Sequence, residues 1–469
     1  MKEKILKILK IIVFTILLLV CVVSVYNVLA WKDTSGKYLS TMKQLYATPN
    51  NKIDAVFVGS SHVYCGVYPA KMWQDRGIAG FNMAVSGMDK QSAYYDVVEL
   101  LRTQKPKVIC VDLYPSTFEE HDDQGNVYRN YLSKRLSKNA VDHVNSYIPK
   151  EERSDYIFRF PIVHTRYKEL QKYDFIPYEF NRYGRGDTYS DRIQETYFDE
   201  SVVYNEETPE ITESNREWVD KFAELSAQKG FALEFMLVPY RYTVNERLSL
   251  NSTIAYINEK GIPVTDYSRK MADIGLDGMQ DFIDDGHLNN TGAEKYTEAL
   301  MNDVLSKYDI PNHSGEKGYE LWEEDHYWYD RKRIQAGLNA TQDGYLYMTK
   351  LADLDEAVSI ISLEYNYADE SLGYFGMFEP LGMSYEEFET GGKWIYADGV
   401  LTKVSENDPA GQPFIYEINN RDSFRVMYRG DFNQENISLN KEAVMPAGYN
   451  VTVVTYDLFL EEILENRGF

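Results

Sequence analysis

An uncharged apolar run near the N-terminus constrains this chain more than any other feature of its sequence. Residues 11–30 contain no charged side chain, and about 20 apolar residues in a helix cross a bilayer core of roughly 30 Å. Four lysines precede the run: Lys2, Lys4, Lys7 and Lys10. The positive-inside tendency therefore predicts a cytoplasmic tail (residues 1–10), a transmembrane anchor (residues 11–30) and an extracytoplasmic remainder.

The same run has an alternative interpretation as a cleaved signal peptide. Val28-Leu29-Ala30 places small residues where a signal peptidase would require them. The apolar stretch is longer than in most cleaved signal peptides, which favours a retained single-pass anchor in the cell membrane. Cleavage stays open from sequence alone.

Length and composition indicate a folded protein with more than one domain. The 469 residues exceed what one hydrophobic core usually organises, and 44% hydrophobic with 26% charged residues argues against wholesale disorder. The net charge of −24, with no dense basic block beyond the N-terminal tail, disfavours nucleic acid as a partner. Three cysteines cannot make a disulfide scaffold: Cys21, Cys65 and Cys110.

Short apolar runs alternate with helical patterns through the first two thirds of the chain. The expected strands are Ala55–Val58, Gly80–Val85, Lys107–Val111, Leu233–Val238 and Pro263–Thr265. Asp89 is expected to cap the helix that follows the second strand, and Thr291 to cap a closing helix over residues 291–308. Strands that alternate with helices predict a doubly wound parallel α/β sheet.

These patterns divide the chain into an ordered series of parts. A polar tether (residues 31–52) leads to the α/β domain (residues 53–308), and a linker (residues 309–337) leads to a smaller, β-rich α+β domain (residues 338–469). Residues 114–213 are either a surface insertion or a lid over a site. The strand-like runs of the last domain are Ser359–Leu363, Phe424–Tyr428 and Asn450–Val454.

Ser61 is the candidate nucleophile. It follows a buried strand at a Gly59-Ser60 turn, where a hydroxyl and its own backbone N–H can face the same carbonyl. A serine hydroxyl needs a base near neutral pH, and an imidazole serves best when a carboxylate fixes its tautomer. Asp284 and His287, three residues apart, supply that pair, whereas His62 is the less favoured base.

The order of these motifs resembles the SGNH, or GDSL-type, hydrolase superfamily over about residues 53–308. Gly59-Ser60-Ser61 matches its serine turn, Asn82 to Ser86-Gly87 its glycine loop, and Asp284-x-x-His287 its dyad. The resemblance implies a flavodoxin-like domain in which the N–H groups of Ser61 and Gly87 bind the oxyanion. The family's Gly-x-Asn-Asp block is absent, because the chain has Asp112-Leu113-Tyr114-Pro115 there, so Asn82 or a water is expected to supply the third donor.

With its anchor, the chain is similar to the exported branch that includes D-alanyl-lipoteichoic acid transfer and alginate O-acetylation proteins. That branch implies acyl transfer to a cell-surface glycan beside a multi-span membrane O-acyltransferase. About residues 338–469 resemble the interleukin-like EMT-inducer domain, on Val358–Leu363, Ala368–Leu372, Pro380–Gly382, Lys393–Ile395 and Gly448–Asp457. This second resemblance implies either a carbohydrate-binding or a structural module.

Three functions remain open from sequence. The same triad serves an acyltransferase and an esterase, because sugar or water can attack an acyl-serine, and a non-catalytic glycan-binding assembly protein could keep the fold. No metal is implied, since metal-ligand spacing is absent apart from the Asp284–His287 pair. No cofactor is implied, since no glycine-rich phosphate loop follows a strand.

Overall fold

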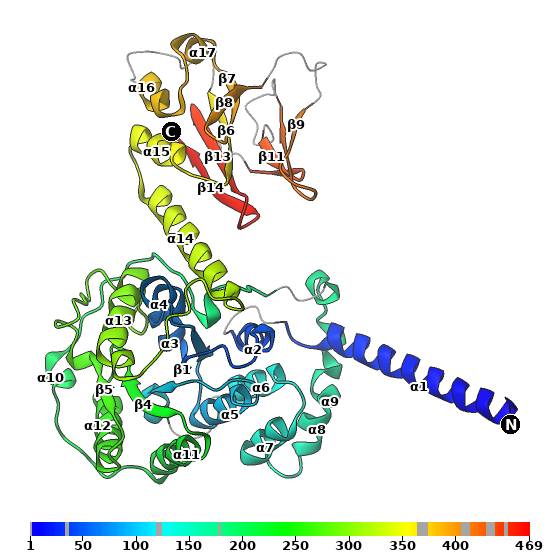
Figure 1. Ribbon diagram of the computed structural model, residues 1–469, viewed down its shortest axis with the longest axis vertical. Helices are drawn as coiled ribbons and strands as arrows, with labels where there is room; N and C mark the ends of the chain where they lie inside the picture. Colours follow the sequence, from blue (N-terminus) through cyan, green and yellow to red (C-terminus); the bar gives the residue numbers. More distant parts are fainter. Residues whose placement is uncertain are drawn as a thin grey trace. The chain divides into compact units, whose positions relative to one another are not determined.

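The apolar run lies within the long helix α1 (Lys2–Leu29), which is the one helix of the described residues that is long and apolar enough to cross a membrane. The computed structural model describes residues 2–32, 37–118, 124–176, 180–363, 374–404, 413–427, 437–444 and 449–469. The chain divides into two units, Met1–His326 and Tyr327–Phe469 (Figure 1).

The first unit is built on a five-stranded parallel sheet with the order β2-β1-β3-β4-β5. Its strands are β1 (Ala55–Gly59), β2 (Gly80–Ala84), β3 (Val108–Asp112), β4 (Ala232–Leu237) and β5 (Val264–Asp266). All five expected runs form strands, and the prediction of a parallel α/β sheet is confirmed. The strand order reverses at β1, which is where doubly wound sheets place their ligands.

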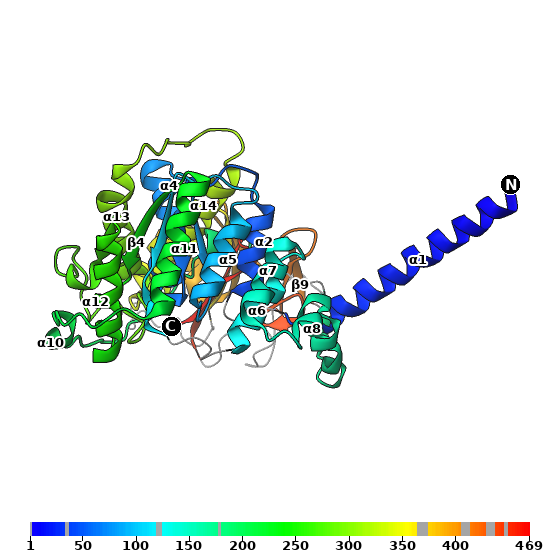
Figure 2. The ribbon, with the colours of Figure 1, turned by 90° about the horizontal axis from the view of Figure 1, so that it is seen from below.

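Helices cover both faces of this sheet, because the strand side chains alternate between two apolar cores (Figures 1 and 2). Val56 and Val58 of β1 face one core, whereas Ala55 and Phe57 face the other. The first core contains α2 (Tyr38–Ala47), α5 (Lys90–Leu100), α11 (Glu213–Lys229) and α12 (Val244–Glu259). The second contains α3 (Ser61–Gly66), α4 (Pro69–Arg76) and α13 (Asn290–Asp303).

Two local expectations are wrong. Residues 38–47, placed in a polar tether, form α2, whose Met42 and Leu45 are buried in the first core. Thr291 does not cap the closing helix α13: the cap is Asn289, whose side chain accepts a hydrogen bond from Gly292 N. The closing helix therefore begins one residue before Thr291.

A helical insertion lies between β3 and β4. It comprises α6 (Gln124–Ser133), α7 (Lys138–Tyr147), α8 (Arg153–Phe158), α9 (Phe160–Val163) and α10 (Glu200–Val203), with short 3₁₀ turns that include η2 (His164–Lys168), η3 (Lys172–Phe175) and η4 (Gly184–Gly186). Helices α6 to α8 share a small core of their own, around Tyr131 and Val144. The insertion contacts α2, α5 and the end of α1.

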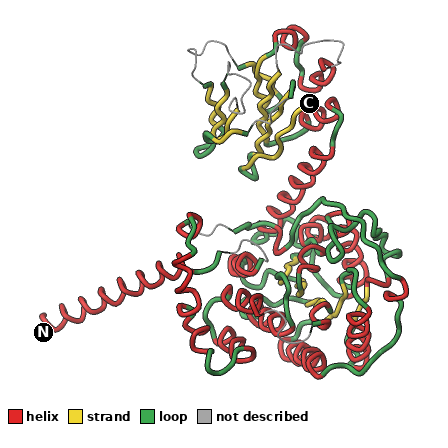
Figure 3. The backbone as a smooth tube through the Cα atoms, turned by 180° about the vertical axis from the view of Figure 1, so that it is seen from behind, coloured by secondary structure: helices red, strands yellow, loops and turns green. Residues whose placement is uncertain are grey.

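The second unit contains two sheets whose strands pair antiparallel, and Figure 3 draws these strands in yellow. One sheet has the order β14-β13-β6-β7-β8, from β6 (Ala357–Leu363), β7 (Gly392–Ala397), β8 (Val400–Lys403), β13 (Val451–Asp457) and β14 (Glu462–Gly468). The other has the order β12-β11-β10-β9, from β9 (Phe414–Glu417), β10 (Ser423–Val426), β11 (Ile437–Leu439) and β12 (Glu442–Ala443). Three helices pack on the larger sheet: α15 (Gly344–Ala352), α16 (Tyr374–Phe378) and α17 (Tyr385–Thr390).

The expected linker is partly helical. Residues 320–337 lie in α14 (Glu320–Ala340), and this helix contains the boundary between the two units. Some residues on which the second resemblance rests, 368–372 and Gly448, lie outside the described residues, as does Tyr428 at the end of an expected strand.

Candidate active site

Ser61 lies directly after β1, as the first residue of α3. The side chain of Ser60 caps this helix by accepting a hydrogen bond from His62 N at 3.3 Å. Gly59 has no room for a side chain, since a Cβ there would lie 2.5 Å from Val63 Cγ2 and 2.7 Å from Asp112 Cβ. The glycine thus lets α3 begin close against β3, with Ser61 at the carboxyl edge of the sheet.

The structure brings Ser61, His287 and Asp284 into one hydrogen-bonded chain. Ser61 Oγ lies 2.7 Å from His287 Nε2, although the two residues are 226 positions apart. His287 Nδ1 lies 2.8 Å from Asp284 Oδ1 and 3.0 Å from Oδ2. In this geometry the carboxylate fixes the Nδ1–H tautomer, which leaves Nε2 able to accept the serine proton.

A tight loop before α13 holds the Asp284–His287 pair. Within the loop, Ile283 N donates to His287 O at 3.0 Å, and Gly286 N donates to Asp284 Oδ1 at 2.7 Å. At its base, Asn289 N donates to Asp281 O at 3.0 Å. Hydrogen bonds of backbone groups within residues 281–289 therefore hold Asp284 and His287 in position.

The insertion braces this loop from outside. Thr196 Oγ1 donates to Asp284 O at 3.1 Å, and Gln194 N donates to Phe282 O at 2.8 Å. Sequence reasoning did not single out Thr196, because it lies 88 residues before Asp284 and no local pattern marks it. Residues 194–196 of the insertion thus border the candidate site, whether the insertion is a surface elaboration or a lid.

The dyad is open to solvent. The side chains of His287 and Asp284 are 26% and 44% exposed, and Ser61 is half-buried. The three side chains are therefore partly exposed and are not sealed in the core.

His62 is placed to pack. Its ring is buried between Tyr114 and Tyr240, with centroids 4.0 and 4.5 Å away, and it has no carboxylate partner among the described residues. Burial, and then the nearby His287, lower the pKa of His62 well below its usual value. A neutral imidazole without a carboxylate is a poor general base, which favours His287 for that role.

Two backbone N–H groups are suited to an oxyanion. Neither Ser61 N nor Gly87 N has a hydrogen-bond partner in the described part of the chain. Both follow adjacent parallel strands, which stay paired as far as the bond from Val85 N to Gly59 O. Gly87 has φ +57°, a conformation that favours glycine. Two unpaired donors thus follow neighbouring strands at one edge of the sheet.

The third-donor expectation for Asn82 is wrong. Asn82 lies inside β2 with no exposed surface, and its Nδ2 donates to Val67 O at 2.7 Å. The amide is held within the core and is not presented at the carboxyl edge. No other side chain is assigned as a third donor.

Asp112 lies where the resembled family has its Gly-x-Asn-Asp block. Sequence reasoning did not single out this residue as unusual. Its carboxyl is fully buried, with Oδ1 accepting from Val238 N at 3.3 Å and Oδ2 lacking a hydrogen-bond partner among the described residues. Burial raises the pKa of Asp112 to about 7. The one available signal was an acidic residue at the end of an apolar strand.

Comparison with known proteins gives little beyond this geometry. No family model matches the chain, and no curated protein matches it. Among solved structures, the chain is similar to an acylhydrolase, so assigned provisionally, from Bacteroides fragilis, with 10% identity and a TM-score of 0.29. The match covers 58% of this chain and 95% of that one. The functional conclusion therefore rests on the site itself.

Proposed function

We propose that the protein is a membrane-anchored, extracytoplasmic serine O-acyltransferase that moves an acetyl-type acyl group onto a cell-surface polysaccharide. The observation that carries the proposal is the chain of hydrogen bonds from Asp284 through His287 to Ser61. This chain is the arrangement that activates a serine for acyl chemistry. The long apolar helix α1 supports attachment to a membrane.

In the first half-reaction, Ser61 Oγ attacks the acyl carbonyl while its proton passes to His287 Nε2. The N–H groups of Ser61 and Gly87 would stabilise the tetrahedral oxyanion, and loss of one such donor typically costs about 3–4 kcal/mol of transition-state stabilisation. Collapse breaks the bond to the leaving group, which takes the proton from His287. Ser61 is left as an acyl ester.

In the second half-reaction, a sugar hydroxyl attacks the acyl-serine. His287 removes the hydroxyl proton and then returns it to Ser61 Oγ as the ester bond to the enzyme breaks. Water in place of the sugar would make the protein a carbohydrate esterase with the same residues. Membrane anchoring favours transfer, because it would hold the site near a multi-span membrane O-acyltransferase that could supply the acyl group.

The test uses the full-length protein with an activated acetyl ester, with and without an oligosaccharide acceptor. We expect a transient acetyl adduct on Ser61, detected by intact-protein mass spectrometry, and acetylated sugar when the acceptor is present. Ser61→Ala should abolish both. Release of free acetate only, with no acetylated sugar, would reject transfer in favour of hydrolysis.

The neighbouring serine is the matched control. Ser60 carries the same functional group one residue earlier, but its hydroxyl caps α3, so Ser60→Ala should keep the adduct. If Ser61→Ala turned over the ester as fast as the unmodified protein, both enzyme proposals would fail. A non-catalytic glycan-binding role, with the second unit as a carbohydrate-binding module, would then be the remaining proposal.

A further inference from the structure

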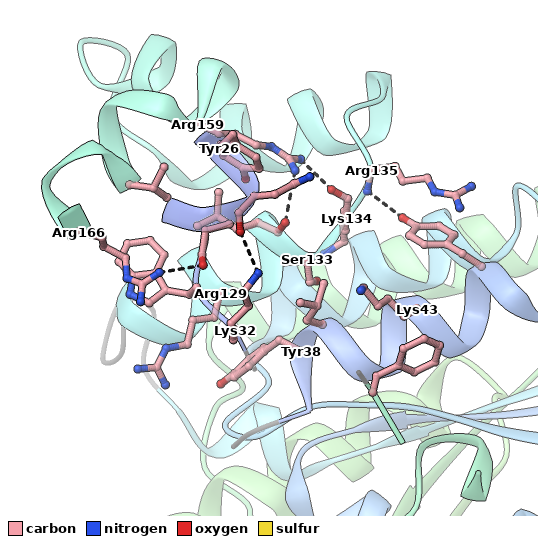
Figure 4. A pocket seen from close by; sticks show the side chains of 18 of the residues that line it. Tyr26, Lys32, Tyr38, Lys43, Arg129, Ser133, Lys134, Arg135, Arg159 and Arg166 are labelled. Carbon is pink, nitrogen blue, oxygen red and sulfur yellow. Dashed lines mark hydrogen bonds between the residues drawn. The ribbon is translucent and has the colours of Figure 1, made fainter. Parts of the chain in front are cut away.

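A large cavity lies where the chain leaves α1. Its volume is about 890 Å³, and one side of it is formed by Tyr26, Asn27, Ala30 and Trp31, at the end of the apolar helix (Figure 4). The other sides come from α2, α6 and the insertion between residues 159 and 180. We call this cavity the anchor pocket. It is separate from the Ser61 site, none of whose residues lines it.

The anchor pocket is strongly basic. Of its 20 lining residues, seven are Lys or Arg, and none of these described residues is acidic. The chain as a whole has a net charge of −24, so this concentration of cations is opposite in sign to the rest of the protein. Two of the seven have carboxylate partners behind the wall: Lys134 pairs with Asp96, and Arg166 pairs with Asp174 at 3.0 Å.

Four other cations of the pocket form no direct ion pair among the described residues. Lys32, Arg129, Arg135 and Arg159 form no ion pair with a carboxylate of the described residues. Arg129 and Arg135 are exposed side chains of the rim. An anion that entered the cavity would therefore meet cations that no carboxylate contacts directly. Two of them, Lys32 and Arg159, donate to backbone carbonyls, and Arg135 lies over the Tyr46 ring.

The inner wall is held in place by the backbone. Arg159 donates from Nη1 to Leu132 O at 3.3 Å and from Nη2 to Lys134 O at 2.8 Å, which fixes its guanidinium. Its Nε is buried without a hydrogen-bond partner among the described residues, and so is that of Arg166. Burial lowers the pKa of Lys32, an effect that the nearby Asp174 partly offsets. Burial and then the neighbouring Lys32 lower the pKa of Lys43. A bound anion would offset these costs.

The pocket adjoins the membrane helix directly. Arg166 Nη1 donates to Leu29 O and Ala30 O, each at 2.8 Å, so two hydrogen bonds join the insertion to the C-terminal end of α1. Helix α9 and the turn η2 also contact α1, and Figure 1 shows them beside its C-terminal end. If α1 spans the bilayer with its lysines in the cytoplasm, the anchor pocket lies at the outer membrane surface.

Residues 158–176 of the insertion expose large apolar side chains. Six of them, between 39% and 75% exposed, are Phe158, Phe160, Tyr167, Tyr173, Phe175 and Ile176. Five of the six are aromatic, and exposed aromatic side chains are typical of segments that enter a bilayer interface. The exposed aromatics and the basic cavity therefore point to one environment, the headgroup layer.

We infer that the anchor pocket binds the phosphate-bearing headgroup of an anionic phospholipid in the outer leaflet of the membrane. Lys32 and Arg159 contact the phosphate inside the pocket, and the exposed Arg129 and Arg135 attract it from the rim through their charge. Tyr173 and Phe180 lie against the glycerol and the start of the acyl chains. The lipid would join α1 to the insertion and hold the first unit against the membrane.

The test measures lipid retention by native mass spectrometry on the full-length protein in a non-ionic detergent. Phosphatidylglycerol and phosphatidylcholine with identical acyl chains are added in equal amounts. We expect one phosphatidylglycerol to be retained in preference to phosphatidylcholine. Arg129→Gln with Arg135→Gln should weaken that preference about 30-fold, the effect of two cations that each contribute about 1 kcal/mol beside an anionic headgroup.

The matched control removes two exposed cations of the first unit that lie outside the pocket, Lys105→Gln with Lys229→Gln. It should leave the preference unchanged, and thermal melting should show that both double variants remain folded. Equal retention of the two lipids, or the same loss in the control, would overturn the proposal. So would displacement of phosphatidylglycerol by an equal concentration of glycerol phosphate, because the pocket would then bind soluble phosphate without regard to the lipid.

Discussion

At the scale of single residues, the candidate site contains two side chains that would act on the substrate and one that would orient the histidine ring. Ser61 and His287 touch the reacting atoms in the proposed mechanism, whereas Asp284 acts through His287 Nδ1. Its side chain is 44% exposed and bonded within its own loop, so its loss should affect chemistry more than folding.

Asp284→Asn is therefore expected to lower kcat for an activated acyl ester by about 10²–10⁴-fold, because the amide favours the wrong imidazole tautomer. KM should change little, since the carboxylate does not contact substrate. The control is Asp285→Asn, one residue away, where the side chain pairs with the exposed Arg241 at 2.8 Å. Equal losses in both variants would contradict the orienting role.

A second prediction concerns the pH dependence of stability and rests on the buried Asp112. Its pKa in the folded protein is about 7, above the value of about 3.9 for an exposed aspartate. From about pH 4 to pH 7 the unfolded chain loses this proton while the folded protein keeps it, so stability falls as pH rises through that window. Above about pH 7 both states have lost the proton, and the stability no longer depends on this group.

Asp112→Asn removes this titration. Between pH 5 and pH 8 the free energy of unfolding of the variant, relative to the unmodified protein, should rise by roughly 2–3 kcal/mol. Urea unfolding at the two pH values measures it. A variant whose stability keeps the same pH dependence as the unmodified protein would show that Asp112 is not the source.

The sequence singled out Ser61, Asp284 and His287, which the structure joins by hydrogen bonds, because each belongs to a short local motif. It could not place Asn82 or Thr196. Asn82 follows the alternation of a strand into the core, where Val67 O accepts its amide hydrogen bond. Thr196 reaches Asp284 only through the fold of a long insertion.

At the scale of elements, the cap of α13 links stability to the candidate site, because the helix begins directly after the loop that holds Asp284 and His287. Asn289 Oδ1 accepts from Gly292 N at 3.0 Å, and its Nδ2 donates to Gln280 O at 2.6 Å. The residue therefore ties the helix start to the base of the loop. Thr291, two positions on, is exposed.

Asn289→Ala is expected to destabilise the first unit by about 1 kcal/mol or more, which is typical for a lost helix cap, and to lower kcat as the loop loosens. Thr291→Ala should change the melting temperature and kcat little. Thermal melting and ester turnover on both variants distinguish the two caps. The reverse order of effects would restore Thr291 as the cap.

The strands were predictable because buried parallel strands are short, continuous apolar runs with clear ends. The helix α5 was predictable from its cap, and Asp89 Oδ1 does accept from Gln91 N and Ser92 N at 2.8 and 2.9 Å. The helix α2 was missed because its buried face includes polar residues. The amide nitrogen of Gln44 donates to the distant carbonyls of Asn181 and Tyr183, which no local pattern reveals.

At the scale of the whole molecule, each unit has its own buried ion pair to the helix α14. Arg185 pairs with Asp325 at 2.5 Å in the first unit, and Arg331 pairs with Asp457 at 2.6 Å in the second. Both pairs are almost fully buried. Removal of one partner from such a pair leaves an uncompensated charge.

Arg331→Met should therefore lower the stability of the second unit by about 3–5 kcal/mol and leave the first unit unchanged. Differential scanning calorimetry on the full-length protein should show one transition shifted to lower temperature. Arg333→Met is the control, because Arg333 is 50% exposed. A shift of both transitions together would show that the two units unfold as one.

The contact between Arg166 and the carbonyls of Leu29 and Ala30 also bears on how the chain matures. A processing peptidase needs an extended backbone whose carbonyls are free to pair with the enzyme, and here the bond after Ala30 sits against a guanidinium at the end of a helix. Leu29 is only 6% exposed. Once the insertion has folded, the bond after Ala30 would therefore be protected, and any cleavage there would have to precede that folding.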